Sequence, residues 1–133
     1  SHPKSVFMYK DRDGLLCAGP MWDYDWGTFM PINTQQYCIK NTLYYPNLFR
    51  SYYFVQQIKE RWQTAKPRFE ALIDVFEQEA AKLKNSDQMN ISLWPIASRV
   101  NGDETMSFEE AVATMKQAYV EKLQWLDAQI NAM

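Results

Sequence analysis

Two aspartates, Asp23 and Asp25, stand two residues apart in an aromatic segment, residues 19–26 (GPMWDYDW). At the end of an extended strand, this spacing puts both carboxylates on one face and the neighbouring aromatic rings on the other. Two acids on one face need a compensating positive charge. Mg²⁺ suits them because it binds one or two carboxylates and completes its shell with water and phosphate oxygens. The spacing predicts a divalent-metal site, and a turn cap or pairing with Arg or Lys is the alternative.

The flanking sequence predicts the elements that position these carboxylates. Residues 5–10 and 15–19 are short apolar runs joined by a turn with an Asp-Gly step, which is typical of a β-hairpin. The second strand is expected to continue into residues 21–24, bent or bulged at the Gly-Pro step. Residues 26–45 carry Gly, Pro and Asn without a sustained period. They predict a long loop.

The remainder of the chain predicts helices. Apolar residues recur at steps of three or four along residues 48–62, including Tyr52, and again along residues 69–83. Pro67 is expected to end the first helix and to suit the first turn of the next. A shorter helix is expected over residues 87–93, ended by a Trp-Pro step.

The last helix has the strongest pattern. Ser107 and Glu110 form a capping box. One apolar seam follows: Phe108, Val112, Met115, Tyr119, Leu123, Leu126 and Ile130. The predicted fold class is α+β, mainly α, with an N-terminal β-hairpin packed on about three to four helices. At this length we expect a single domain over 1–133, divided into a hairpin with the metal segment (1–26), a loop (27–46) and a helical part (47–133).

Composition narrows the function classes. The net charge is -2 and there is no basic block, so no nucleic-acid partner is expected. No apolar run approaches the roughly 20 residues that cross a bilayer, so no membrane span is expected. Cys17 and Cys38 are too few for a disulfide framework and lack the neighbours of a zinc site. Free buried thiols are expected, with one disulfide as the alternative.

A family resemblance covers nearly the whole chain. Residues 1–10 (SHPKSVFMYK), Gly14 and residues 19–25 (GPMWDYD) resemble the spore-coat protein H (CotH) kinase family. Residues 107–112 (SFEEAV) and 124–127 (QWLD) are similar to that family's closing helix. Its middle helices carry aromatic and basic residues where this chain has Tyr52, Tyr53, Arg61 and Trp62. The resemblance implies the C-terminal, kinase C-lobe-like part of an atypical protein kinase.

The resemblance also implies roles for individual residues. Such kinases use ATP with Mg²⁺ or Mn²⁺ to phosphorylate a Ser or Thr hydroxyl of a protein substrate. Asp23 matches the metal-chelating Asp, and Asp25 would be a second ligand or orient a metal-bound water. Ser5 stands where the family has a metal-coordinating Asn. His2 would support the catalytic loop by hydrogen bonding.

Two parts of a kinase are missing from the sequence. The family's catalytic Asp would fall just before Ser1, and there is neither a glycine-rich phosphate loop nor a candidate ATP-gripping Lys. The isolated chain is therefore expected to be inactive. The resemblance implies a secreted protein or one at the cell or spore surface.

Two other function classes stay open. One is a non-catalytic surface or coat-assembly module that binds protein or glycan through an exposed aromatic loop. Its contact residues would be Trp26, Phe29, Tyr37, Tyr44 and Tyr45. The other is a glycan hydrolase that uses Asp23 and Asp25. It is disfavoured because neighbours two residues apart on one strand do not flank a glycosidic bond.

Overall fold

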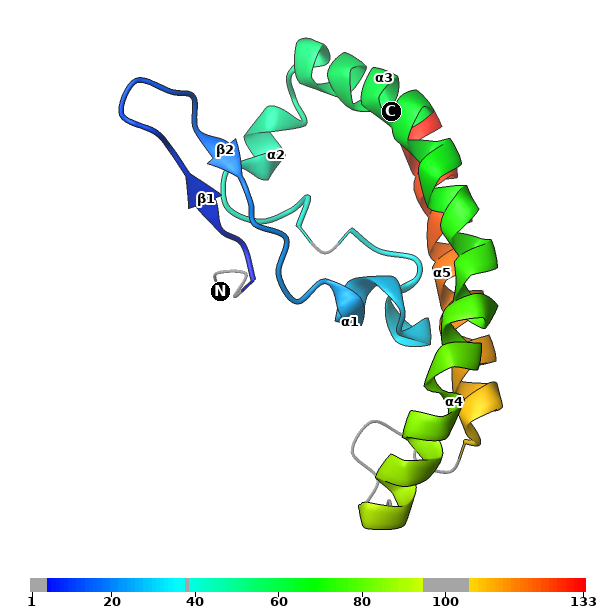
Figure 1. The fold of residues 1–133 in the computed structure, drawn as a ribbon. Helices are drawn as coiled ribbons and strands as arrows, with labels where there is room; N and C mark the ends of the chain where they lie inside the picture. The colour runs from blue at the N-terminus through cyan, green and yellow to red at the C-terminus, as the bar shows by residue number, and fades with distance from the viewer. Residues whose placement is uncertain (1–4, 38, 95–105) are drawn as a thin grey trace.

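A computed structural model describes residues 5–37, 39–94 and 106–133. The chain is mainly helical with a small N-terminal antiparallel hairpin (Figure 1), so the predicted mainly helical α+β class is confirmed. Three long helices make up most of it: α3 (Tyr52–Ala71), α4 (Val75–Leu93) and α5 (Phe108–Asn131). Within the described ranges, no helix is long and apolar enough to cross a membrane.

The hairpin pairs β1 (Met8–Tyr9) with β2 (Cys17–Ala18). The strands are shorter than the predicted runs 5–10 and 15–19, although the Gly19 amide still donates to the Phe7 carbonyl at 3.0 Å. Figure 1 shows the hairpin standing apart from the three long helices. Leu15 at the turn end is 85% exposed. Regular pairing is limited to two residues on each strand, and the apolar side chains at the turn end stay exposed.

The predicted loop contains three short helical turns. These are α1 (Asp25–Thr28), the 3₁₀ turn η1 (Pro31–Asn33) and α2 (Tyr45–Leu48). The chain between them is irregular, and several side-chain contacts tie it to α5. Lys122 donates to the Gln36 carbonyl, and the Tyr37 ring lies edge-on to Trp125 with 4.7 Å between centroids.

Pro67 does not divide the first two long helices. It lies inside α3, which continues to Ala71, and the α-helical pattern is interrupted only at the 3₁₀ turn η2 (Leu72–Asp74), before α4 begins. The prediction of a break at Pro67 is wrong because this side chain is exposed, so water can satisfy the carbonyl that loses its amide partner. Figure 1 shows α3, η2 and α4 as one continuous curved path.

The separate short helix expected over residues 87–93 is also absent as a separate element. Those residues are the last two turns of α4, which ends before Trp94 as predicted. Two ion pairs link the first half of α4 to α5: Lys116 with Glu77 at 2.5 Å, and Lys84 with Glu109 at 2.8 Å.

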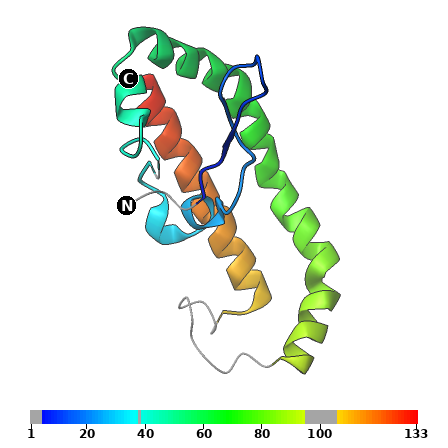
Figure 2. The same cartoon turned by 90° about the vertical axis from the view of Figure 1, so that its left-hand side faces the viewer.

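The core lies where α5 meets α3 and the start of α4 (Figure 2). The capping box of α5 is confirmed, and its seam is buried or half-buried along its whole length. Trp62 of α3 is 7% exposed, whereas Tyr52 is 79% exposed. The predicted apolar face of this helix is therefore wrong at Tyr52, which points to solvent. The hydrophobic cluster combines Trp62, Tyr119, Leu123 and Ile130 with Phe29, Ile58, Ile73, Phe76, Leu126 and Met133.

Candidate functional site

Ser5 and Asp23 meet at the open end of the hairpin. Ser5 precedes β1 by three residues and Asp23 follows β2 by five, so strand pairing returns the chain to its starting point. The Ser5 hydroxyl donates to Asp23 Oδ2 at 3.0 Å. This contact joins two of the three described residues that the resemblance placed at the metal. The third, Asp25, has no side-chain contact with either.

The backbone explains why Asp23 and Asp25 do not share a strand face. Asp23 has a φ of 60°, in the left-handed region, and Tyr24 is helical. Asp25 then begins α1, where its carbonyl accepts from the Phe29 amide at 2.8 Å. The predicted extension of the second strand through residues 21–24 is therefore wrong, and with it the same-face argument. Asp tolerates this left-handed conformation better than most residues.

The surroundings of the two carboxylates differ. Asp23 is exposed and has one hydrogen-bond partner, Ser5, so most of its lone pairs are free for a cation and water. Asp25 lines an apolar groove between α4 and α5. Neither forms an ion pair with a Lys or Arg that the structure describes. The alternative of simple pairing with a basic side chain thus finds no support.

The donor atoms of this site make up only part of a metal shell. Over residues 5–37, 39–94 and 106–133, no group of three His, Cys, Asp or Glu residues is placed to hold an ion. A carboxylate with an adjacent hydroxyl still suits Mg²⁺, which keeps several waters and takes further oxygens from phosphates. His2 lies outside the described residues. Ser5 and Asp23 thus fit part of a metal shell, with water and substrate as the complement.

Cys17 does not contribute to this site. Cys17 is a half-buried free thiol on β2, and its sulfur lies 3.5 Å from the Leu15 carbonyl. Cys38 lies outside the described residues. The expectation of free buried thiols is therefore met only in part, because Cys17 is not fully buried.

The aromatic residues of the loop separate into two groups. Phe29 stacks on Tyr119 at 5.9 Å, and Tyr37 packs on Trp125, so both face inward. Burial raises the pKa of the Tyr37 hydroxyl above its usual range. Trp26 is 56% exposed and Tyr44 is 37% exposed. An exposed surface formed by all five aromatic residues is therefore not present.

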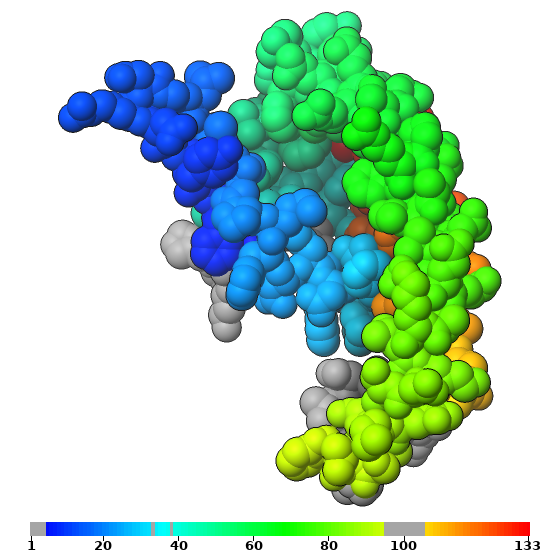
Figure 3. All heavy atoms as spheres, viewed as in Figure 1, coloured from blue at the N-terminus to red at the C-terminus, as the bar shows by residue number. Residues whose placement is uncertain are grey.

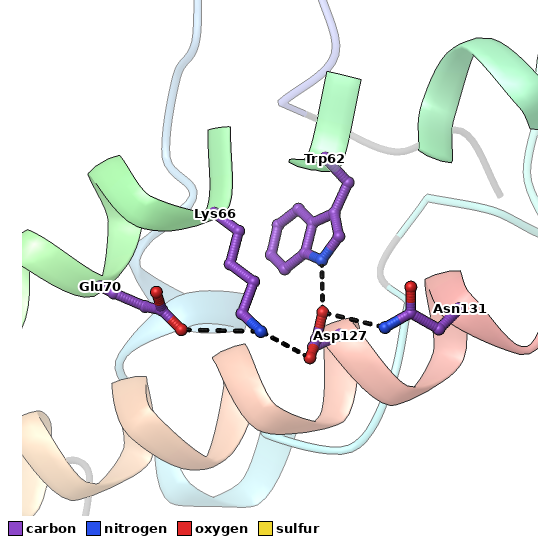
Figure 4. Close-up of polar contacts among 5 residues, drawn as sticks. All are labelled: Trp62, Lys66, Glu70, Asp127 and Asn131. Carbon is purple, nitrogen blue, oxygen red and sulfur yellow. Dashed lines mark hydrogen bonds and ion pairs between the residues drawn. The ribbon is translucent and has the colours of Figure 1, made fainter. Parts of the chain in front are cut away.

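Asp127 is a polar centre that the sequence reasoning did not single out. Its carboxylate accepts from Trp62 Nε1 at 2.8 Å, from Lys66 Nζ at 2.8 Å and from Asn131 at 3.1 Å (Figure 4). Lys66 also lies 3.7 Å from Glu70. The i,i+4 spacing of Asp127 and Asn131 predicts their contact from the sequence, but the partners on α3 are brought to Asp127 by tertiary packing. Every donor comes from α3 or α5, so this network joins two helices.

Comparisons of the chain with protein families, curated proteins and solved structures found no match.

Proposed function

We propose that this chain is the C-terminal part of an atypical, CotH-like protein kinase. The parent protein would transfer phosphate from ATP to a Ser or Thr hydroxyl of a protein substrate. The observation that carries the proposal is the Ser5–Asp23 contact of 3.0 Å across 18 residues of sequence. In protein kinases a catalytic-loop residue and a later Asp together hold the metal ions, so such residues must meet in space.

Each residue would have a separate task. A divalent cation, when bound, would bridge the phosphate oxygens and offset the charge that develops in transfer. Asp23 would hold it directly. The Ser5 hydroxyl would fix the Asp23 carboxylate by donating to it, or turn its oxygen to the cation. Asp25 is the candidate second ligand or the group that orients a metal-bound water, and His2 would support the catalytic loop.

The test uses the full-length protein that contains this chain. Phosphate transfer from ATP to a protein acceptor is measured with Mg²⁺ or Mn²⁺, and Mn²⁺ binding is measured separately by calorimetry. Asp23→Asn should lower both, with transfer reduced on the order of a hundredfold, because the metal contact supplies several kcal/mol. Asp13→Asn, in the hairpin turn, is the matched control and should leave both unchanged.

Ser5 gives a graded test of the same site. Ser5→Ala should weaken Mn²⁺ binding because the Asp23 carboxylate loses its only hydrogen-bond partner among the described residues. Ser5→Asn should strengthen it, because an amide oxygen is a better ligand for a hard cation than a hydroxyl. Unchanged transfer in Asp23→Asn would refute the assignment of that residue.

The isolated chain should turn over no appreciable ATP, because a kinase needs a nucleotide-binding lobe and a catalytic Asp that this sequence lacks. Robust ATP turnover by the purified 133-residue chain would contradict this reading. If the full-length protein binds neither metal nor nucleotide, a surface-binding module becomes the better account. Trp26 and Tyr44 would then be its first residues to substitute, because both rings are exposed. The secreted or spore-surface location is part of the same proposal.

A further inference from the structure

An apolar groove of about 740 Å³ lies along α4 and α5 and is bordered by α1 and η1. The segment from α1 to η1 and helix α4 lie next to each other on the face in Figure 3, and both line the groove together with α5. The rings of Phe29, Phe76 and Tyr119 form its floor, with centroids 5.3 to 6.1 Å apart. All three belong to the hydrophobic cluster. The groove therefore opens directly onto the core.

The shape of the groove fits a helix. Its lining runs from Leu72 to Leu83 on one side and from Phe108 to Tyr119 on the other. Each stretch is about 17 Å long at 1.5 Å per residue, or roughly three helical turns. Two amphipathic helices side by side leave a groove that a third helix fills, with apolar side chains at steps of three and four. Leu83 is 54% exposed, so a large apolar side chain at the rim has no cover.

The charge of the groove specifies the occupant further. Among its described lining residues the only charged ones are acids, Asp25 and Glu79. Glu79 pairs with Lys82 at 2.5 Å, but both side chains are more than half exposed, and such pairs are weak. The Asp25 carboxylate has no ion pair with any residue in the described ranges. A basic side chain on the occupant would complement these acids.

We propose that this groove binds an amphipathic helix of another protein, about three turns long, with an apolar face and a Lys or Arg opposite Asp25. The occupant would cover Leu83 and shield the aromatic floor from water. Met30, Met106 and Met115 also line the groove, and flexible Met side chains adapt to a range of apolar partners. The proposal uses neither metal nor nucleotide and does not involve Ser5 or Asp23. It does use Asp25, so a partner helix at that carboxylate would compete with the metal role that the kinase proposal gives to Asp25.

The test measures fluorescence anisotropy of labelled synthetic helical peptides with the purified chain. The first peptide has 14 residues, a leucine face and three lysines; the second has glutamate in place of lysine; the third has the composition of the first in scrambled order. We expect the lysine peptide to bind at least tenfold more tightly than either of the others. Equal binding of the lysine and glutamate peptides, or no binding of the lysine peptide, would overturn the proposal.

Two pairs of variants locate the binding. Ala111→Arg places a charge in the groove, and Ala128→Arg places one on an exposed position of the same helix. Leu83→Ala removes a rim side chain that is 54% exposed, and Leu93→Ala removes one outside the groove that is 64% exposed. Ala111→Arg should weaken binding of the lysine peptide at least tenfold and Leu83→Ala severalfold, whereas both controls should bind like the wild type.

Circular dichroism in the helical region checks that each variant is folded. If Ala111→Arg does not fold, Leu83→Ala still tests the proposal. Sedimentation of the wild type tests the other occupant. If the chain dimerises through this groove and does not bind the lysine peptide, the occupant is a second copy and the proposal is wrong. Unchanged peptide binding by Leu83→Ala would also overturn it.

Discussion

At the scale of single residues, Asp127 is the most constrained carboxylate that the structure describes. The Lys66 ammonium has the largest effect on the pKa of Asp127, and Trp62 has the next largest. Both donate hydrogen bonds to the charged carboxylate. They lower the pKa of Asp127 below its ordinary value. The same hydrogen bond raises the pKa of Lys66. Each group is therefore held in its charged state where α3 meets α5.

This shift predicts how stability depends on pH. An acid with a lowered folded-state pKa contributes stability that is fully present above its unfolded pKa, about 3.9 for Asp, and is lost as the pH falls through the folded value. Thermal unfolding from pH 7 to pH 2 should therefore show Asp127→Asn less stable than the wild type at pH 7. The gap should shrink below about pH 4.

Asp13→Asn is the control for this measurement. Its carboxylate lies in the exposed hairpin turn and has no partner among the described residues, so this variant should follow the wild-type curve at every pH. A constant gap between wild type and Asp127→Asn down to pH 2 would mean that the Asp127 charge does not join the two helices.

At the scale of elements, the N-terminus of α5 makes its own contribution to stability. The Glu110 amide donates to Ser107 Oγ at 3.2 Å, and the Ser107 amide donates to Glu110 Oε2 at 2.7 Å. Ser107→Ala should lower the free energy of unfolding by about 1 kcal/mol, measured by urea denaturation. Glu110→Gln should retain most of the stability, because Gln also completes a capping box. Equal losses in both variants would contradict this account.

Pro67 gives a second prediction for an element. Because it lies inside α3 without an amide to donate, Pro67→Ala restores one helical hydrogen bond. The gain is reduced because Ala makes the unfolded chain more flexible, so we expect a net stabilisation of about 2 kcal/mol in urea. Pro46→Ala is the control, since Pro46 lies in the first turn of α2, where proline is tolerated, and should bring no gain.

The helical part of the chain could be predicted from the sequence, although the break at Pro67 and the separate helix over residues 87–93 were wrong. The candidate site could be predicted only in part. Apolar periodicity and the capping box at Ser107 gave α5 correctly, because both signals are local. The prediction that Asp23 lies in an extended strand was wrong. The residue types around it do not indicate its left-handed backbone, and an alternating pattern cannot distinguish a strand from this bend. The partners of Asp127 also depend on packing, since Lys66 is 61 residues away in sequence.

At the scale of the whole molecule, the chain has a large surface for its size. Its accessible area is 10391 Å², whereas a compact monomer of 15.7 kDa exposes roughly 7,300 Å². Among the described residues, the hairpin contributes to this large area, because it projects from the body of the molecule in Figure 3. Leu15 and Met21 are each 85% exposed. Both the Ser5–Asp23 pair and the apolar groove belong to this open architecture.

The open shape predicts the behaviour of the isolated chain in solution. A compact chain of 133 residues has a radius of gyration of about 14 Å, and the projecting hairpin should raise the measured value well above that. Small-angle X-ray scattering of the monomer provides the measurement. The lysine peptide gives the control, because a helix in the groove would cover apolar surface without moving the hairpin, so the radius should stay high. A value near 14 Å without peptide would mean that the hairpin folds back onto the helices, and the Ser5–Asp23 end would then have different neighbours.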